Sequence, residues 1–221
     1  MKLAYPQFDF CIESEENKAN VLVIESPIFL RRVVSEIDSQ IKTKVGSFVL
    51  SDDEILPFEK KAVIITDLFN LDLEQKKFTS KIITDLSLRA YDDENYTETV
   101  TFLSNAERYI SEFILKSDIP LDYSAPSLEG ILKVFNIKAR AEGESLPEKL
   151  IDYLSLMNRV FSVNYFIIYS LHSLFTKDEL KEFYRFAFLK KYDILSIEHT
   201  VGDKLDCEKY YIVDSDLCSI I

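Results

Sequence analysis

The sequence predicts an α/β protein with a mostly parallel sheet and an inserted α-helical lobe. Five short apolar runs, rich in β-branched and aromatic residues, have the length of strands. Each run is nearly continuous rather than alternating, which is typical of strands that are covered on both faces. The runs are VLVIE (21–25), AVIITD (62–67), YFIIYS (165–170), ILSIE (194–198) and YYIVD (210–214). Between the second and third runs the residue pattern is helical.

An α-helix is predicted over residues 27–43, directly after the first strand. Ser26 suits the N-cap, and Pro27 suits the first helical position because its fixed φ angle matches the helix. The apolar residues that follow recur with a helical period. Two lysines near the C-terminal end of this helix and Gly46 just beyond it indicate that the helix has ended before Gly46.

Two capping boxes mark the starts of further helices. In Thr176-Lys-Asp-Glu179 the hydroxyl accepts from the backbone of the first turn, and the carboxylate reaches back to the N-cap. We therefore predict a crossover helix over residues 177–191 that joins two strands. Ser145-Leu-Pro-Glu148 has the same pattern and predicts another helix start.

Residues 74–160 contain no strand-like run. We interpret them as a helical lobe inserted into an α/β head that is formed by residues 1–73 and 161–221. The helical stretches of the lobe are KKFTSKIITDLSLRAY, YTETVTFLSNAERYISEFIL, SLEGILKVFNI and LPEKLIDYLSLMNRVF. Turn-forming residues such as DDEN at 92–95 separate them.

Charge and composition limit the classes of function. The chain has 26 basic and 38 acidic residues and a formal charge of −12, so its mean field repels phosphate unless a local or assembled basic patch reverses it. The N-terminus has no apolar signal-peptide region, and no stretch approaches the roughly 20 apolar residues of a membrane span. We expect a cytoplasmic protein with no membrane partner. The three cysteines lack C-x-x-C spacing, which predicts free thiols.

The second apolar run ends at Asp67, a position that holds Mg²⁺ in nucleotide-hydrolysing α/β proteins. A phosphate cradle also needs a glycine-rich loop, because only glycine lets backbone N–H groups wrap the anion. The four glycines are at least 13 residues apart, so neither G-x-x-x-x-G-K-[ST] nor G-x-G-x-x-G occurs. Glu25 follows the first strand, where a phosphate would have to lie. One alternative stays open, a divergent metal-dependent nucleotide or phosphoester hydrolase that uses Asp67, Glu25 and Glu198.

The two histidines, His172 and His199, show no catalytic pattern. Neither has a cysteine or an acidic residue at metal-ligand spacing, and neither belongs to a nucleophile motif. We expect hydrogen-bonded structural residues, with a role as general base or ligand as the alternative.

Four segments, in order along the chain, carry a resemblance to a known family. They are VLVIESPIFLRRVV, AVIITDLFNLDL, IPLDYSAPSLEGILKVFNIKAR and LFTKDELKEFYRFAFLKKYDILSIE. They resemble the small ring-forming spacer-acquisition proteins of type II-A CRISPR systems, in the Csn group. None of the segments is a catalytic signature, so the likeness rests on their amino-acid sequences and on their order along the chain.

This resemblance implies a head related to P-loop ATPase cores that lacks their nucleotide site, and it implies no enzymatic activity. It also implies a homotetrameric ring whose positively charged hole accepts double-stranded DNA and prefers free ends, with bound calcium. Family members act with the adaptation integrase and the effector nuclease when new spacers are captured in bacterial antiviral defence.

Basic residues that reach phosphates would hold the duplex. The predicted DNA-binding residues are Arg31, Arg32, Lys42, Lys44, Lys133, Lys138 and Arg140. Each cluster has a plainer interpretation as a solvated helix face or as cations at a helix C-terminus. We expect contact with the duplex backbone without base recognition, because threading through a ring provides charge but no helix in the major groove.

Calcium, which the resemblance implies, needs six to eight oxygen ligands. The corresponding turn, SDIPLDYSAPSLE, offers the carboxylates of Asp118, Asp122 and Glu129, which are the candidate metal ligands. Ser124 and Ala125 occupy positions where the family has further acids. The alternative is that Asp122 begins a turn before a helix.

Overall fold

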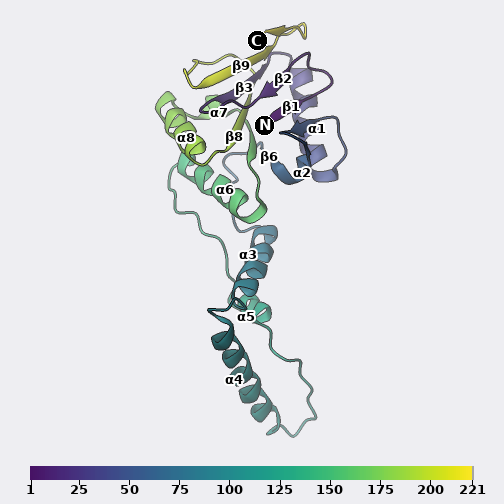
Figure 1. The fold of residues 1–221 in the computed structure, drawn as a ribbon, viewed down its shortest axis with the longest axis vertical. Helices are drawn as coiled ribbons and strands as arrows, with labels where there is room; N and C mark the ends of the chain where they lie inside the picture. The colour runs from purple at the N-terminus through teal and green to yellow at the C-terminus, as the bar shows by residue number, and fades with distance from the viewer. Residues whose placement is uncertain (221) are drawn as a thin grey trace. The chain divides into compact units, whose positions relative to one another are not determined.

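The computed structural model describes residues 1–220, which form two compact units (Figure 1). The head consists of Met1–Leu71 and the chain from Ala141 onward, and the lobe consists of Asp72–Arg140. No helix within the described residues combines the length and the apolar character needed to cross a bilayer.

A six-stranded sheet forms the centre of the head. Its strand order is β10-β9-β3-β8-β7-β6, and every neighbouring pair is parallel except β9 and β10. The strands are β3 (Ala19–Ile24), β6 (Ala62–Ile65), β7 (Tyr165–Tyr169), β8 (Asp193–Glu198), β9 (Glu208–Val213) and β10 (Ser219–Ile220). The five apolar runs of the sequence are the five parallel strands, so the mostly parallel sheet is confirmed.

Helices cover both faces of this sheet, which explains the continuous apolar runs. On one face lies α1 (Pro27–Thr43), whose Val33 and Ile37 are fully buried against the sheet. On the other lie α8 (Lys177–Leu189) and α6 (Leu146–Phe161), which pack against each other (Figure 1). The head also contains the single-turn helices α2 (Phe58–Lys61) and α7 (Leu171–Leu174).

The position of α6 corrects the predicted lobe, which extended to residue 160. Both capping boxes are present as predicted, including the one that begins α6. However, α6 belongs to the head, and its Leu150 and Leu154 are fully buried there. A helical period shows that a helix has an apolar face, but it does not show which unit covers that face.

A second, four-stranded antiparallel sheet in the head was not predicted. Its order is β2-β1-β4-β5, and its strands are β1 (Lys2–Ala4), β2 (Cys11–Glu13), β4 (Val49–Ser51) and β5 (Ile55–Leu56). Strands of two or three residues are too short to show a clear alternation. Their inward side chains Leu3, Ile12 and Leu50 nevertheless have at most 1% of their surface exposed.

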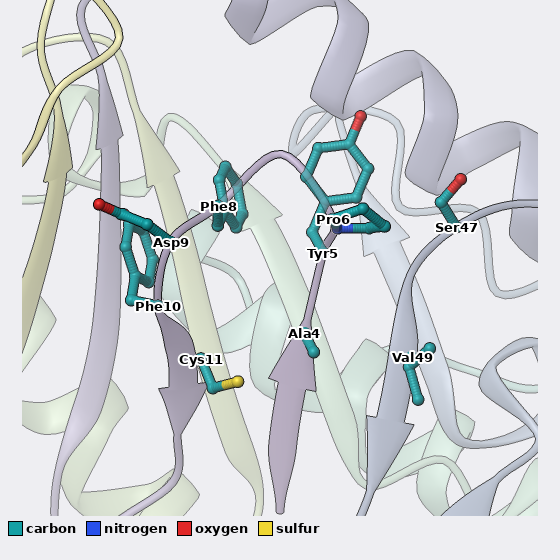
Figure 2. Close-up of a pocket in the computed structure, with 9 residues that line it drawn as sticks. All are labelled: Ala4, Tyr5, Pro6, Phe8, Asp9, Phe10, Cys11, Ser47 and Val49. Atoms are coloured by element: carbon teal, nitrogen blue, oxygen red, sulfur yellow. The ribbon is translucent and has the colours of Figure 1, made fainter.

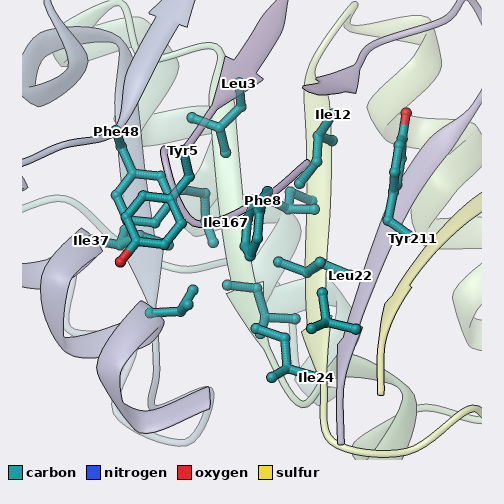
Figure 3. Close-up of a cluster of buried hydrophobic side chains, with 14 of the residues drawn as sticks. Leu3, Tyr5, Phe8, Ile12, Leu22, Ile24, Ile37, Phe48, Ile167 and Tyr211 are labelled. Carbon is teal, nitrogen blue, oxygen red and sulfur yellow. The ribbon is translucent and has the colours of Figure 1, made fainter. Parts of the chain in front are cut away.

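The main core lies between the two sheets and α1. Figure 3 shows Leu3 and Ile12 of the small sheet facing Leu22 and Ile24 of the large one. Aromatic side chains from the connecting segments close the sides, among them Tyr5, which stacks on Phe48 with ring centroids 4.1 Å apart. This core anchors the first turn of α1 and the carboxyl end of β3.

The lobe contains three helices: α3 (Lys76–Arg89), α4 (Tyr96–Ile114) and α5 (Leu128–Val134). They match the predicted helical stretches. Phe78 and Ile83 of α3 are buried, whereas neither α4 nor α5 contributes a buried residue. By itself the lobe therefore has only a small core.

Candidate nucleic-acid interface

Helix α1 presents two of the predicted DNA-binding residues on one exposed side. Arg31 and Lys42 are eleven residues apart, which is close to three helical turns and about 16 Å along the axis. Asp38 lies between them and pairs with Lys42 at 2.6 Å. Within residues 1–220, Arg31 forms no ion pair, so of these two residues it is the one whose charge no carboxylate partly neutralises.

The two remaining predicted cations are Arg32, next to Arg31 in α1, and Lys44, just after the last helical residue. Arg32 donates to Oε1 of Gln7 at 3.4 Å. Lys44 is the C-cap in a left-handed conformation with φ of 65°, and its backbone N–H donates to the carbonyl of Gln40. Both side chains are exposed. The helix therefore offers a row of cations that is partly neutralised by its own carboxylate.

The lobe cations are more fully paired. Lys133 forms a 2.7 Å ion pair with Glu129, and Lys138 pairs with Glu74. Arg140 is exposed and forms no ion pair among the residues that the structure describes. These three residues lie in the lobe, whereas the α1 cations lie in the head.

The predicted calcium ligands do not form a site within one chain. Asp118, Asp122 and Glu129 are all exposed. Asp122 accepts the backbone N–H of Tyr123 at 2.8 Å, and Glu129 is held by Lys133. Among residues 1–220, no three His, Cys, Asp or Glu side chains are grouped so that they could hold a metal ion. The carboxylates of this turn therefore do not fit a calcium cage by themselves.

Within residues 1–220, Asp67, Glu25 and Glu198 do not form a group that could hold a metal ion, so the structure lacks the cluster on which the hydrolase alternative depends. Asp67 accepts from the backbone N–H of Phe69 at 3.0 Å and so caps its own loop. Glu198 has 3% of its surface exposed and points into the protein, where it accepts from the Ser196 hydroxyl at 2.6 Å. The alternation of side chains along β8 places Glu198 on the face under α8 rather than at the edge of the sheet.

Sequence reasoning missed a buried polar cluster under helices α7 and α8. Nε2 of His172 lies 2.9 Å from Oε1 of Glu208, whose side chain is fully buried. The other oxygen of Glu208 accepts from the backbone N–H of Leu205 at 2.8 Å and from the Tyr210 hydroxyl at 3.1 Å. The hydroxyl of Tyr184 in α8 lies 3.4 Å from Nε2 of His172. Oε1 is satisfied only while Nε2 of His172 carries a proton.

The pKa values of the cluster follow from burial and pairing. Burial alone lowers the pKa of His172, but the hydrogen bond and the attraction to Glu208 outweigh it and raise that pKa. Burial alone raises the pKa of Glu208, but hydrogen bonds from His172 and Leu205 outweigh it and lower that pKa. Burial dominates for Glu198, and its pKa is raised.

Both histidines are therefore hydrogen-bonded parts of the structure. Nδ1 of His199 lies 3.1 Å from the carbonyl oxygen of Ile24 and links the ends of β8 and β3. No sequence signal could have paired His172 with Glu208, because the two meet only through the order of strands in the sheet.

A shallow groove of about 420 Å³ lies on the outer side of the small sheet (Figure 2). Ala4, Cys11 and Val49 come from three adjacent strands and line it together with aromatic residues of the first hairpin. The groove contains no cation, so its lining does not suit phosphate.

A family model described as CRISPR-associated protein (Cas_Csn2) matches residues 28–217. The chain belongs to the Cas_Csn2 family. The match runs from α1 to beyond β9 and includes the whole lobe, which confirms the family that the sequence resemblance indicated. Membership in Cas_Csn2 supports a role in CRISPR adaptation.

Proposed function

We propose that this Cas_Csn2 protein is a non-enzymatic, homotetrameric ring that holds linear double-stranded DNA during spacer acquisition. The family match over residues 28–217 carries the proposal, because the resemblance attaches this function to that family. The adaptation integrase and the effector nuclease are the protein partners that we propose with it.

The turn after β3 supports a head that is related to P-loop ATPase cores but has lost the nucleotide site. This turn carries Glu25, Ser26 and Pro27 in place of a glycine-rich loop. Ser26 caps α1 by accepting the N–H of Phe29, so one of the amide donors that would face a phosphate is already used. A carboxylate at this position also repels phosphate.

The exposed lobe surface supports assembly from several copies. Helix α4 has no buried residue, and large apolar side chains such as Tyr109 and Phe113 have about two thirds of their surface exposed. Soluble monomers rarely expose contiguous apolar patches of more than a few hundred Å². Burying one such side chain against a second copy contributes about 1.5–3 kcal/mol. A second copy of this chain is the occupant that we propose for the apolar side of α4.

Assembly also resolves the conflict between the charge of −12 and a DNA ligand. A ring can gather cations on its inner wall while the excess carboxylates face outward, and a local positive field then attracts the duplex. We propose that calcium binds between copies of the chain. Asp118, Asp122 and Glu129 supply some of its ligands, and residues of other copies supply the rest. A chelator is then expected to reduce the molar mass of the assembly.

Two measurements test the proposal. Light scattering of the purified protein is expected to give the mass of four copies. A salt titration is expected to show that linear duplex is bound and that closed circular duplex of the same sequence is bound far more weakly, because a closed circle offers no end to thread. Equal affinity for both forms would refute end threading, and a monomer without DNA affinity would refute the whole proposal.

A further inference from the structure

Helix α8 carries a row of cations that was not among the predicted DNA-binding residues. Lys177, Lys181 and Arg185 follow one another at intervals of four residues, so they share one face of the helix at steps of about 6 Å. All three are exposed. The opposite face of α8 is apolar and packs on the sheet through Leu180, Phe183, Tyr184 and Ala187.

The layer formed by α6 and α8, with the two lysines that follow it, is basic in an otherwise acidic chain. Residues 146–161 and 177–191 contain seven cations and five acids. Three of these acids accept hydrogen bonds from the backbone. Glu148 and Glu179 do so in the two capping boxes, and Asp152 accepts the backbone N–H of Gly143 at 2.8 Å. Among the described residues, Asp178 is the one of these five acids that forms an ion pair with a cation of the layer, Lys181.

The ion pairs along the row are weak and exposed. Lys177 pairs with Asp203 at 2.9 Å, and Lys181 lies 3.5 Å from Asp178. Exposed pairs of this kind contribute about 0–1 kcal/mol, so a phosphate can replace either acid at little cost. Arg185 forms no ion pair within the described part of the chain. It borders a groove of about 450 Å³ whose lining also includes Lys181 and Phe188.

We infer that the α8 row, defined as Lys177, Lys181 and Arg185, contacts successive phosphates along one strand of a DNA duplex. The three residues span about 12 Å along the helix axis, whereas one strand presents a charge about every 3.4 Å of duplex axis. The row therefore matches a stretch of three to four phosphates. Contacts of this kind position a duplex without recognising its bases.

This inference rests on the proposed DNA binding and makes it more specific. Helix α1 covers the opposite face of the same sheet, so its cations and the α8 row lie on different sides of the head. A duplex that runs along the α8 row does not touch Arg31 and Lys42 of the same head. The two surfaces can therefore be separated by mutation.

The test compares the salt dependence of binding to a linear duplex between variants of the whole protein. Each phosphate contact adds about 0.9 to the slope of log K against log salt concentration, so Lys181→Gln with Arg185→Gln is expected to lower its magnitude by about 1.8 for each copy whose α8 row contacts the duplex. Arg108→Gln with Lys116→Gln, both exposed in the lobe, makes the same change in net charge and is expected to keep the slope. Lys181→Arg with Arg185→Lys retains both charges and is also expected to keep it.

Two results overturn the inference. If the wild type binds duplex but the Lys181/Arg185 variant keeps the full slope, α8 does not contact DNA and the proposed function stands; a slope that Arg31→Gln with Lys42→Gln lowers would then place the duplex on the α1 side. If the lobe control lowers the slope equally, the effect is one of net charge alone. Failure of the wild type to bind at all overturns the proposed function itself.

Discussion

Replacing Glu208 by glutamine tests whether the buried cluster holds the head together. The substitution keeps the shape of the side chain and removes its charge, so no cavity is created. Three donors face the carboxylate: Nε2 of His172, the backbone N–H of Leu205 and the hydroxyl of Tyr210. Because an amide has one acceptor oxygen and presents N–H groups in place of the other, at least one donor loses its partner.

The cost follows from burial. Removing one partner of a buried ion pair typically destabilises a protein by about 3–5 kcal/mol, and the oxygen that remains in glutamine places Glu208→Gln near 3. For a chain of 150–250 residues each kcal/mol shifts Tm by about 2–4 °C, so a decrease of about 6–12 °C is expected.

Thermal unfolding followed by circular dichroism at pH 6 measures this change. Asp38→Asn is the matched control, because it removes the same kind of charge from the exposed pair with Lys42 and is expected to change stability by less than about 1 kcal/mol. A Glu208→Gln variant that melts within a degree of the wild type would show that the cluster contributes no net stability and that this reasoning is wrong.

Three further predictions concern His172, helix α6 and helix α4. The pKa of His172 is raised by its pairing with Glu208, so the stability that this pair contributes is complete below pH 6.5, the ordinary pKa of histidine, and is lost as the pH rises through the raised pKa. The Tm difference between wild type and Glu208→Gln is therefore expected to shrink from pH 6 to pH 8.5. A Tm difference that stays constant would contradict this. Leu154→Ala removes a fully buried side chain of α6 and is expected to cost about 2–5 kcal/mol in urea unfolding, whereas a negligible loss would argue against its place in the head core. Phe113→Asp on the exposed side of α4 is expected to reduce the molar mass in light scattering without changing the Tm of the head, and an unchanged mass would exclude this face from assembly.

The strands and capped helices of the head were predictable because their signals are local. Burial on both faces makes β3 and β7 continuous apolar runs, and the capping boxes at Ser145 and Thr176 mark helix starts by themselves. The unit to which α6 belongs was not predictable, because an apolar stripe does not identify its partner. The small antiparallel sheet was missed because its strands have at most three residues.

Side-chain direction and tertiary pairing explain the remaining differences at the candidate site. Glu198 ends a strand, but its side chain points under α8, and only the register of β8 decides that. His172 and Glu208 pair through elements that are distant in the sequence. The α8 row is different, since the four-residue spacing of Lys177, Lys181 and Arg185 was visible in a helix that was itself predicted.

The convergence on Glu208 also has a consequence for local motion. One carboxylate joins α7, the start of β9 and the loop before it, so loss of this carboxylate's bonds frees all three segments at once. We expect their amide protons to exchange with deuterium at a common rate set by one opening event, rather than each at its own pace.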